Sequence, residues 1–170
     1  MNYADTNWLE AVYIGADPRD LEAVSRRQTV ERFGRKHGGK LVISQIVLLE
    51  ARNVFCRTTG EAEPREWFQL QADFGARVYV DPMNWDILRR ECNELFAKWA
   101  WKVALGTFDV AIVASAKLAG ASQFLSFDLN AKVLAAVEGL AVFPPLDKKG
   151  ATLLSDLKRA SERKHSRQGR

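Results

Sequence analysis

The sequence predicts an α/β fold built on a mostly parallel central sheet of about five strands flanked by helices. Short β-like runs alternate along the chain with helical patterns. Strands separated by helices almost always form parallel sheets with right-handed crossovers, which favours this fold class. The 170 residues, of which 47% are hydrophobic and 27% charged, are typical of one compact globular domain.

Taken in order, each element has a local signal. The expected strands are 2–4, 41–44, 77–80, 123–127 and 140–143, short apolar runs rich in β-branched and aromatic residues. The expected helices, where apolar residues recur with helical period, are 7–14, 18–37, 45–58, 64–74, 83–100, 108–119 and 129–138. Glycines follow several of them, as at Gly38, Gly60, Gly120 and Gly139. Pro144 and Pro145 then separate this core from a tail.

Positive charge is concentrated in that tail. Residues 147–170 hold eight Lys or Arg against three acids, a net charge of +5, while the whole chain carries +4 and residues 1–146 therefore −1. A basic tail can bind polyphosphate, clasp a partner or be a solvated segment. The chain shows no signal-peptide pattern and no apolar run long enough to cross a bilayer, so we expect a cytoplasmic protein with no membrane role. Cys56 and Cys92 lack metal-ligand spacing and read as reduced thiols.

Acidic residues recur near the expected strand ends. Asp5 follows the first strand, Asp128 follows the fourth, Asp109 begins a helix and Glu50 lies in the helix after the second strand. Ligands of open α/β sheets bind beyond the carboxyl ends of the strands, where strand order reverses, so Asp5 and Asp128 are expected at one edge. The alternative is that each aspartate is only a helix N-cap.

Glu50 has a second interpretation of its own. At helical spacing it shares one narrow polar stripe with Asn53 and Arg57, apart from a second stripe that carries Gln45 and Arg52. One stripe can face water and the other can line a cleft. A wide solvent face, or a buried interaction between Glu50 and Arg57, would explain the pattern equally well.

Clustered carboxylates with few histidines favour metal chemistry. His37 lies in a basic stretch and His165 in the tail, so neither is expected to act as an acid or base held by the core. Carboxylates at close range raise one another's pKa unless positive charge is added. Oxygen-only sites suit Mg²⁺ or Mn²⁺, which can activate water for phosphodiester hydrolysis.

Four segments carry a family resemblance. They are "DTNWL" (5–9), "ISQIVLLEARNVF" (43–55), "GTFDVAIVASAKLAG" (106–120) and "FLSFDLN" (124–130). In order and spacing they resemble the acidic motifs of PIN-domain ribonucleases, most of all the VapC-type toxins of toxin–antitoxin pairs. The resemblance covers roughly residues 1–145 and implies a three-layer PIN-like fold.

The resemblance also implies roles for individual residues. It assigns the metal site to Asp5, Glu50, Asp109 and Asp128. It adds two supporting polar groups, Asn7 and Ser126. The chain departs from the family pattern after Asp128, where Leu129, Asn130, Ala131 and Lys132 stand and the family often places an aromatic residue.

The expectation is therefore a PIN-like catalytic domain at 1–146 with a basic C-terminal tail at 147–170. It would be a metal-dependent endoribonuclease that uses Mg²⁺ or Mn²⁺, cleaves RNA and acts as a toxin. The resemblance further implies a cognate antitoxin and a homodimer, with helix 83–100 as a candidate dimer surface.

Three alternatives stay open. The chain could be a PIN-like module that binds RNA or protein without cutting, or an RNA-processing PIN nuclease outside a toxin–antitoxin system. A receiver-like phosphoaspartate domain shares the α/β layout, but "DTNWL" lacks the Asp-x-Asp arrangement of aspartate-based phosphotransferases.

Two further groups of residues have competing interpretations. Arg26, Arg27, Arg32, Arg35 and Lys36 give helix 18–37 a basic face, either an RNA track or a solvated surface. Four tryptophans lie in amphipathic patterns and are expected to pack in the core or an interface rather than to stack on bases: Trp67, Trp85, Trp99 and Trp101.

Overall fold

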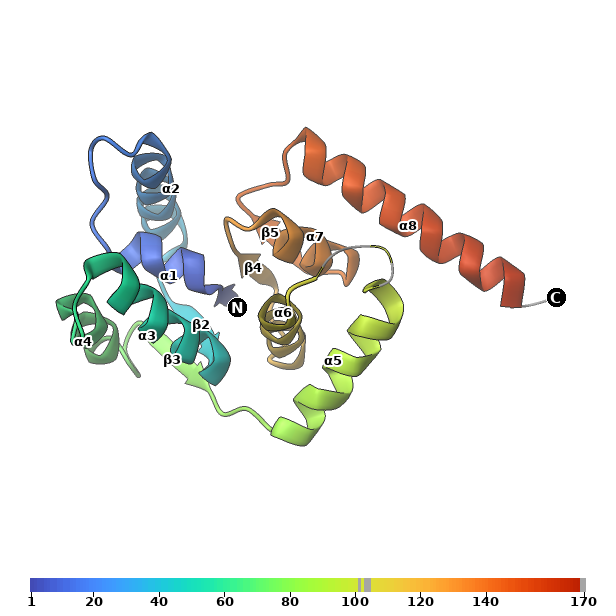
Figure 1. The fold of residues 1–170 in the computed structure, drawn as a ribbon, viewed down its shortest axis with the longest axis horizontal. Helices are drawn as coiled ribbons and strands as arrows, with labels where there is room; N and C mark the ends of the chain where they lie inside the picture. Colours follow the sequence, from blue (N-terminus) through green and yellow to red (C-terminus); the bar gives the residue numbers. More distant parts are fainter. Residues whose placement is uncertain (101, 103–104, 169–170) are drawn as a thin grey trace.

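Five parallel strands form one sheet, in the order β3-β2-β1-β4-β5 (Figure 1). This is a computed structural model, and it describes residues 1–100, 102 and 105–168, with side chains described up to residue 160. The strands are β1 (Asn2–Ala4), β2 (Leu41–Ser44), β3 (Val78–Asp81), β4 (Gln123–Leu125) and β5 (Ala141–Phe143). The predicted α/β class is confirmed, and every strand pairing is parallel.

Helices cover both faces of this sheet (Figure 1). They are α1 (Thr6–Tyr13), α2 (Leu21–His37), α3 (Gln45–Thr59), α4 (Arg65–Ala72), α5 (Trp85–Trp99), α6 (Thr107–Leu118), α7 (Leu129–Val137) and α8 (Lys148–Gln168). In Figure 1, α1 to α4 gather on one side and α5 to α8 on the other. Right-handed crossovers require this, because the chain reverses its direction across the sheet after β3.

Capping residues correct several predicted boundaries. Helix α2 begins at Leu21 and not at 18, because the Asp20 carboxylate accepts the N–H groups of Glu22 and Ala23. Strand β4 stops at Leu125 and not at 127. Ser126 and Phe127 instead turn the chain toward α7.

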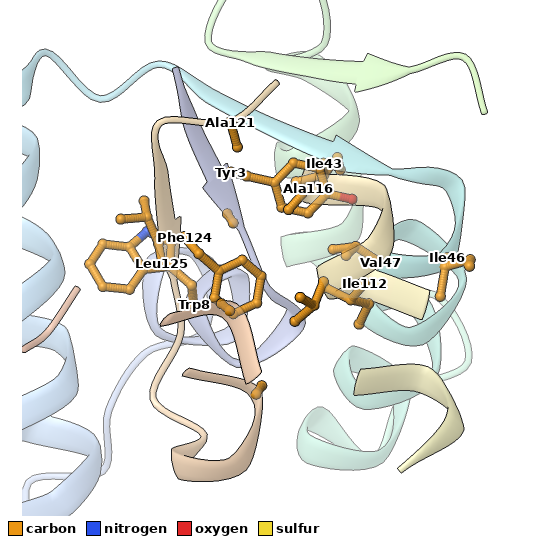
Figure 2. Packing of buried hydrophobic residues seen from close by; sticks show 14 of the residues in the cluster. Tyr3, Trp8, Ile43, Ile46, Val47, Ile112, Ala116, Ala121, Phe124 and Leu125 are labelled. Carbon is orange, nitrogen blue, oxygen red and sulfur yellow. The ribbon is translucent and has the colours of Figure 1, made fainter. Parts of the chain in front are cut away.

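The core around β1 and β4 is aromatic and holds these two strands in register. Figure 2 shows Trp8, Phe124 and Leu125 in this core, with Tyr3 nearby. All four side chains are at most 1% exposed. The Trp8 ring stacks on Phe127 at 5.2 Å between ring centres, which fixes the turn after β4 against α1. The core therefore sets the relative position of the two segments that carry Asp5 and Asp128.

The predicted tail is largely a helix, which the sequence patterns did not anticipate. Helix α8 packs along α7, and its Leu157 is 4% exposed. A side chain at Gly150 would meet Leu129 and Leu146 at 2.9 Å, so the first turn of α8 needs glycine to approach α7. The domain boundary at residue 146 stays a prediction.

The tryptophans divide between core and surface. Trp99 is buried, Trp67 packs under the Arg52 guanidinium and Trp85 is 65% exposed. Trp101 lies outside the described residues. Within the described part of the chain, no helix is both long and apolar enough to cross a bilayer.

Candidate metal centre

The candidate site lies where strand order reverses. From β1 the chain proceeds outward to β2 on one side, and from β4 it proceeds to β5 on the other, so β1 and β4 are the central pair. Asp5 follows β1 directly and Asp128 lies three residues beyond β4. Both therefore emerge at the carboxyl-end edge of the sheet, the usual ligand position in open α/β folds.

Asp5 is buried and held by three donors. Its side chain is 4% exposed and accepts hydrogen bonds from the Thr6 N–H at 2.7 Å, Asn7 Nδ2 at 2.9 Å and Ser126 Oγ at 2.7 Å. Asn7 also accepts the N–H of Phe127 at 2.8 Å, so it links α1 to the turn after β4. The predicted supporting groups Asn7 and Ser126 thus contact Asp5.

Glu50 approaches Asp5 through a residue that the sequence analysis missed. The Thr6 hydroxyl donates to Glu50 Oε2, which ties α3 to the first turn of α1. Among the ion pairs of residues 1–100, 102 and 105–160, none joins Glu50 to Arg57, so that alternative finds no support. The only sequence signal for Thr6 was its place between Asp5 and Asn7.

Asp109 lies in the first turn of α6 against the Gly106 backbone. A Cβ at residue 106 would stand 2.5 Å from Asp109 Oδ2, so any larger residue there would displace this carboxylate from its position. A backbone hydrogen bond from Gly106 favours its charged form. Asp109 is not the N-cap of α6, because that position belongs to Gly106.

Asp128 is the N-cap of α7. Its carboxylate accepts the Ala131 N–H at 2.7 Å, while its own N–H donates to Ser126 Oγ at 2.9 Å. Asp5 likewise caps α1. The capping interpretation is therefore correct for both aspartates, and it does not exclude a second role, because a cap needs only one carboxylate oxygen.

The four carboxylates influence one another electrostatically. Burial raises the pKa of Asp5 to about 7, against the lowering effect of Ser126 and Thr6, and the charges of Glu50 and Asp109 add to the rise. Burial also raises the pKa of Asp109, with contributions from Asp128 and Glu50. The charged forms of Asp5 and Asp109 are thus disfavoured, and the charges of Glu50 and Asp128 contribute to this effect.

The chemistry of these donors fits a hard divalent cation, although their positions do not yet enclose one. All four candidate residues are carboxylates, and no ion pair within the described side chains neutralises any of them. Over the described residues, no three Asp, Glu, His or Cys side chains stand close enough to hold an ion together. Binding would therefore require side-chain rotation about the backbone positions that the fold sets.

Comparison with known families decides the classification. The PIN domain family profile matches residues 3–137, which includes all four acids. The chain belongs to the PIN domain family. The resemblance seen in the sequence motifs is therefore confirmed. No curated protein sequence matches this PIN domain significantly.

Solved structures show the same fold. VapC20 of Mycobacterium tuberculosis, described as a Sarcin-Ricin loop cleaving toxin, superposes with a TM-score of 0.62 at 17% identity, over 83% of this chain and 97% of that one. FitAcB of Neisseria gonorrhoeae gives 0.55 at 16% identity, over 85% and 98%. VapBC2 of Rickettsia felis, bound to a DNA fragment from their promoter, gives 0.51 at 19% identity, over 84% and 97%. At these identities the likeness shows the fold.

Proposed function

We propose that this PIN domain is a metal-dependent endoribonuclease, and that its metal ligands are Asp5, Glu50, Asp109 and Asp128. One observation carries the proposal: Asp5 is buried beside two further acids, its pKa is raised to about 7, and no ion pair of the described side chains offsets its charge. Burying a carboxylate without a cation costs free energy, and carboxylates of this kind occur mostly at functional sites. Mg²⁺ or Mn²⁺ would supply the missing positive charge and activate water for attack on a phosphodiester.

The chain's own residues would prepare the site. Thr6, Asn7 and Ser126 fix both oxygens of Asp5, so this carboxylate needs no reorganisation. The Thr6 hydroxyl keeps Glu50 directed toward the same edge. Asn7 holds the Phe127 N–H and thereby fixes the turn that leads to Asp128. In this proposal Asn7, Ser126 and Thr6 are positioning residues.

Cleavage assays with matched variants test this proposal. We expect the purified chain to cut a mixed-sequence single-stranded RNA in Mn²⁺, and D5N and D109N to lose about 100-fold or more of this activity. D20N is the matched control. Asp20 also caps a helix, α2, but it is exposed and is not one of the four proposed ligands, so D20N should cleave like wild type. Wild-type rates from D5N and D109N would contradict the proposed site.

The chemistry of the product ends gives a second test. Attack by activated water leaves a 5′-phosphate and a 3′-hydroxyl, and we expect these ends on every fragment. A 2′,3′-cyclic phosphate would instead show that the ribose 2′-hydroxyl attacks, which would rule out the mechanism.

One observation favours a second candidate, a PIN-like module that binds RNA or a partner without cutting it. The described side chains hold no ready-made group of three metal ligands. Mn²⁺ added to the wild-type chain with RNA separates the two candidates. Binding without any cleavage, at ion concentrations that saturate the site, would favour the second.

We further propose a toxin role with a cognate antitoxin and a homodimer. The VapC-type motifs and the fold shared with VapC20 and VapBC2 support the toxin role. Trp85 and Ile87 on α5, and Leu118 on α6, are 65%, 43% and 46% exposed and would supply apolar area for a dimer. Copurification with the product of a short neighbouring reading frame tests the first claim, and sedimentation velocity tests the second. An unrelated neighbouring operon would favour RNA processing outside a toxin–antitoxin system.

A further inference from the structure

The two flanks of helix α2 differ in how their basic residues are used. On one flank, the Arg27 guanidinium donates to the carbonyls of Ala11 and Val12 and pairs with Glu31, so it secures the C-terminal end of α1. Arg35 shares this flank, where it lines a hollow of about 660 Å³. The other flank carries Arg32 and Lys36, and Arg26 lies between the two flanks, where it lines a hollow together with Arg27 and Asn7.

Arg26 lies beside the candidate site. Its guanidinium carbon is 5.5 Å from the centre of the Phe127 ring, and Phe127 immediately precedes Asp128. Within the helix it pairs with Glu22. An arginine stacked over a ring keeps its N–H groups in the plane of the guanidinium, so the edge can still bind a phosphate.

Beyond Arg26 along α2, the flank that carries Arg32 and Lys36 lines a groove of about 340 Å³. Arg32, Lys36 and His37 line it on the α2 side, and Phe143 and Pro144 line it on the opposite side. The His37 ring stacks on Phe33 at 4.5 Å between ring centres.

The groove and the candidate site share one wall. Phe127 and Phe143 both pack on Trp8, at 5.2 and 5.9 Å between ring centres. The Ser126 N–H also bonds the Phe143 carbonyl at 3.1 Å. Because Phe127 contacts Arg26 and Phe143 lines the groove, the cations and rings form one strip from the candidate site along α2.

The negative charge of the candidate site explains why a bound RNA would need such a strip. Four carboxylates repel the phosphates of an RNA strand, and an ion at the site offsets that repulsion only locally. Nucleotides on either side of the cleaved bond need cations from the protein. Alternating basic and aromatic side chains are the usual surface for single-stranded nucleic acid, because they bind phosphates and stack on bases.

We propose that this strip, from Arg26 to Lys36 along α2, is the path of the RNA strand as it leaves the candidate site. The phosphates would lie on Arg26, Arg32 and Lys36. The helical rise places the ends of this path about 15 Å apart, enough for a few nucleotides. The inference rests on the proposed function for its choice of ligand. It divides the basic residues of α2 into two sets, of which only one binds RNA.

Binding measured without divalent ions tests the path separately from catalysis. Anisotropy of a fluorescein-labelled single-stranded RNA, in EDTA and across a series of KCl concentrations, compares wild type with R26Q/R32Q/K36Q. We expect about tenfold weaker binding and a slope of log affinity against log salt that is smaller by about 2, since each single-strand phosphate contact contributes about 0.7.

The control is R35Q/R89Q/R90Q, which removes the same charge from exposed positions outside the path. We expect its affinity to stay within about twofold of wild type, because it retains all three phosphate contacts. The charge-preserving variant R26K/R32K/K36R should recover most of the salt slope. Because Arg32 and Lys36 are exposed and Arg26 is half-buried at the surface, thermal melting should confirm that all variants fold.

The outcomes separate the two proposals. If both glutamine variants bind RNA equally well, the path is overturned even when wild type cleaves RNA. If the salt slope falls only for R26Q/R32Q/K36Q while wild type never cleaves in Mn²⁺, the path stands and the nuclease proposal fails. An acidic protein partner that loses affinity for R26Q/R32Q/K36Q, while RNA does not, would also overturn the path.

Discussion

Two clusters of acidic side chains in this chain have opposite electrostatic surroundings. At the candidate metal centre, no ion pair of the described side chains joins a Lys or Arg to the four carboxylates. Lys132 acts on Asp128 only from longer range, and the pKa of Asp5 and of Asp109 is raised. At the junction of α5, α6 and α7, Lys117 donates to both Glu91 and Glu138. The Lys98 Nζ lies 3.7 Å from Glu138, and Trp99 Nε1 donates to it at 2.7 Å.

The difference shows which cluster is structural. Glu138 has only 7% of its side chain exposed, and despite this burial the Lys117 and Trp99 bonds lower its pKa. A buried carboxylate is thus ionised at low cost where the chain supplies its own cation. Among the described side chains none forms an ion pair with Asp5, and in the proposed function a bound metal ion supplies the cation. Acidic residues in a buried cluster are therefore a metal-site candidate only where no internal cation accompanies them.

The largest expected effect on stability follows from breaking the ion pairs of Lys117 with Glu91 and Glu138. Lys117→Met leaves Glu138 buried without its main partner, and we expect a loss of about 3 kcal/mol in unfolding free energy. Urea denaturation at neutral pH measures this loss through the transition midpoint. The double variant K117M/E138Q should regain about half of it, because Glu138, the more buried of the two acids, then carries no charge, while Glu91 still lacks Lys117. A single variant as stable as wild type would show that Lys117 does not compensate these acids.

The second expected effect occurs at the candidate site, where the charge of a buried carboxylate lowers the stability of the metal-free fold. In the folded chain the pKa of Asp5 is raised from 3.8 to about 7, so below that pH the native state binds more protons than the unfolded state. Stability without metal should thus fall as pH rises from about 4 to about 7. A shift of this size corresponds to at most about 4 kcal/mol.

D5N removes that charge, and we expect it to stabilise the metal-free chain by about 2 kcal/mol at pH 8. The gain is smaller than the full shift because an amide has only one oxygen. It cannot accept from Thr6 on one side and from Asn7 and Ser126 on the other. The gain should vanish near pH 4, where wild type is protonated as well. D20N, at an exposed cap, should change the unfolding free energy by less than about 0.5 kcal/mol at every pH, because asparagine caps a helix about as well as aspartate. Equal stability of D5N and wild type at pH 8 would argue against a costly charge at Asp5.

The contrast between the clusters also shows what the sequence could and could not predict. The parallel sheet and the acids near strand ends follow from local patterns, and the family resemblance added Asn7 and Ser126. The structure has this sheet, and both of these residues contact Asp5. The Lys117 network was not predicted, because Glu91, Lys117 and Glu138 lie on three helices whose relative rotation is set by packing. No periodicity along one helix reports that rotation.

Other details were missed for comparable reasons. Helix α8 was interpreted as a tail, because its few apolar residues, such as Leu153 and Leu157, are surrounded by charge, and only packing against α7 gives them a buried face. Thr6 was overlooked because a threonine after an aspartate is an ordinary helix start. The sequence likewise gave no reason to separate Arg26 from Arg27, whose different partners depend on the position of α1.

The third expected effect is the rise in stability when divalent ions bind. It distinguishes the two acidic clusters, because only the candidate metal centre is expected to bind an ion. At an ion concentration of about ten to a hundred times Kd, binding to the folded chain should add about 1.4 to 2.7 kcal/mol of stability. For a chain of this size, that corresponds to a rise of about 3 to 10 °C in melting temperature. Differential scanning fluorimetry with Mn²⁺ and Mg²⁺ measures the rise.

The two clusters should differ in that experiment. E50Q, which removes a proposed ligand, should lose most of the ion response, whereas E138Q should keep it despite a lower melting temperature. The same response in both variants would place the ion elsewhere than among Asp5, Glu50, Asp109 and Asp128.

The smallest expected effect concerns exposed ion pairs, which test whether burial makes the Lys117 network costly to break. Arg89 and Asp86 on α5 are 3.9 Å apart, with side chains 66% and 83% exposed. Water already solvates both charges, so R89Q should change the unfolding free energy by less than about 0.5 kcal/mol. Urea denaturation at low and high salt measures this change, and the small difference should disappear at high salt. If R89Q cost as much as K117M, then charge count rather than burial would govern both sites, and the contrast between the two acidic clusters would lose its physical basis.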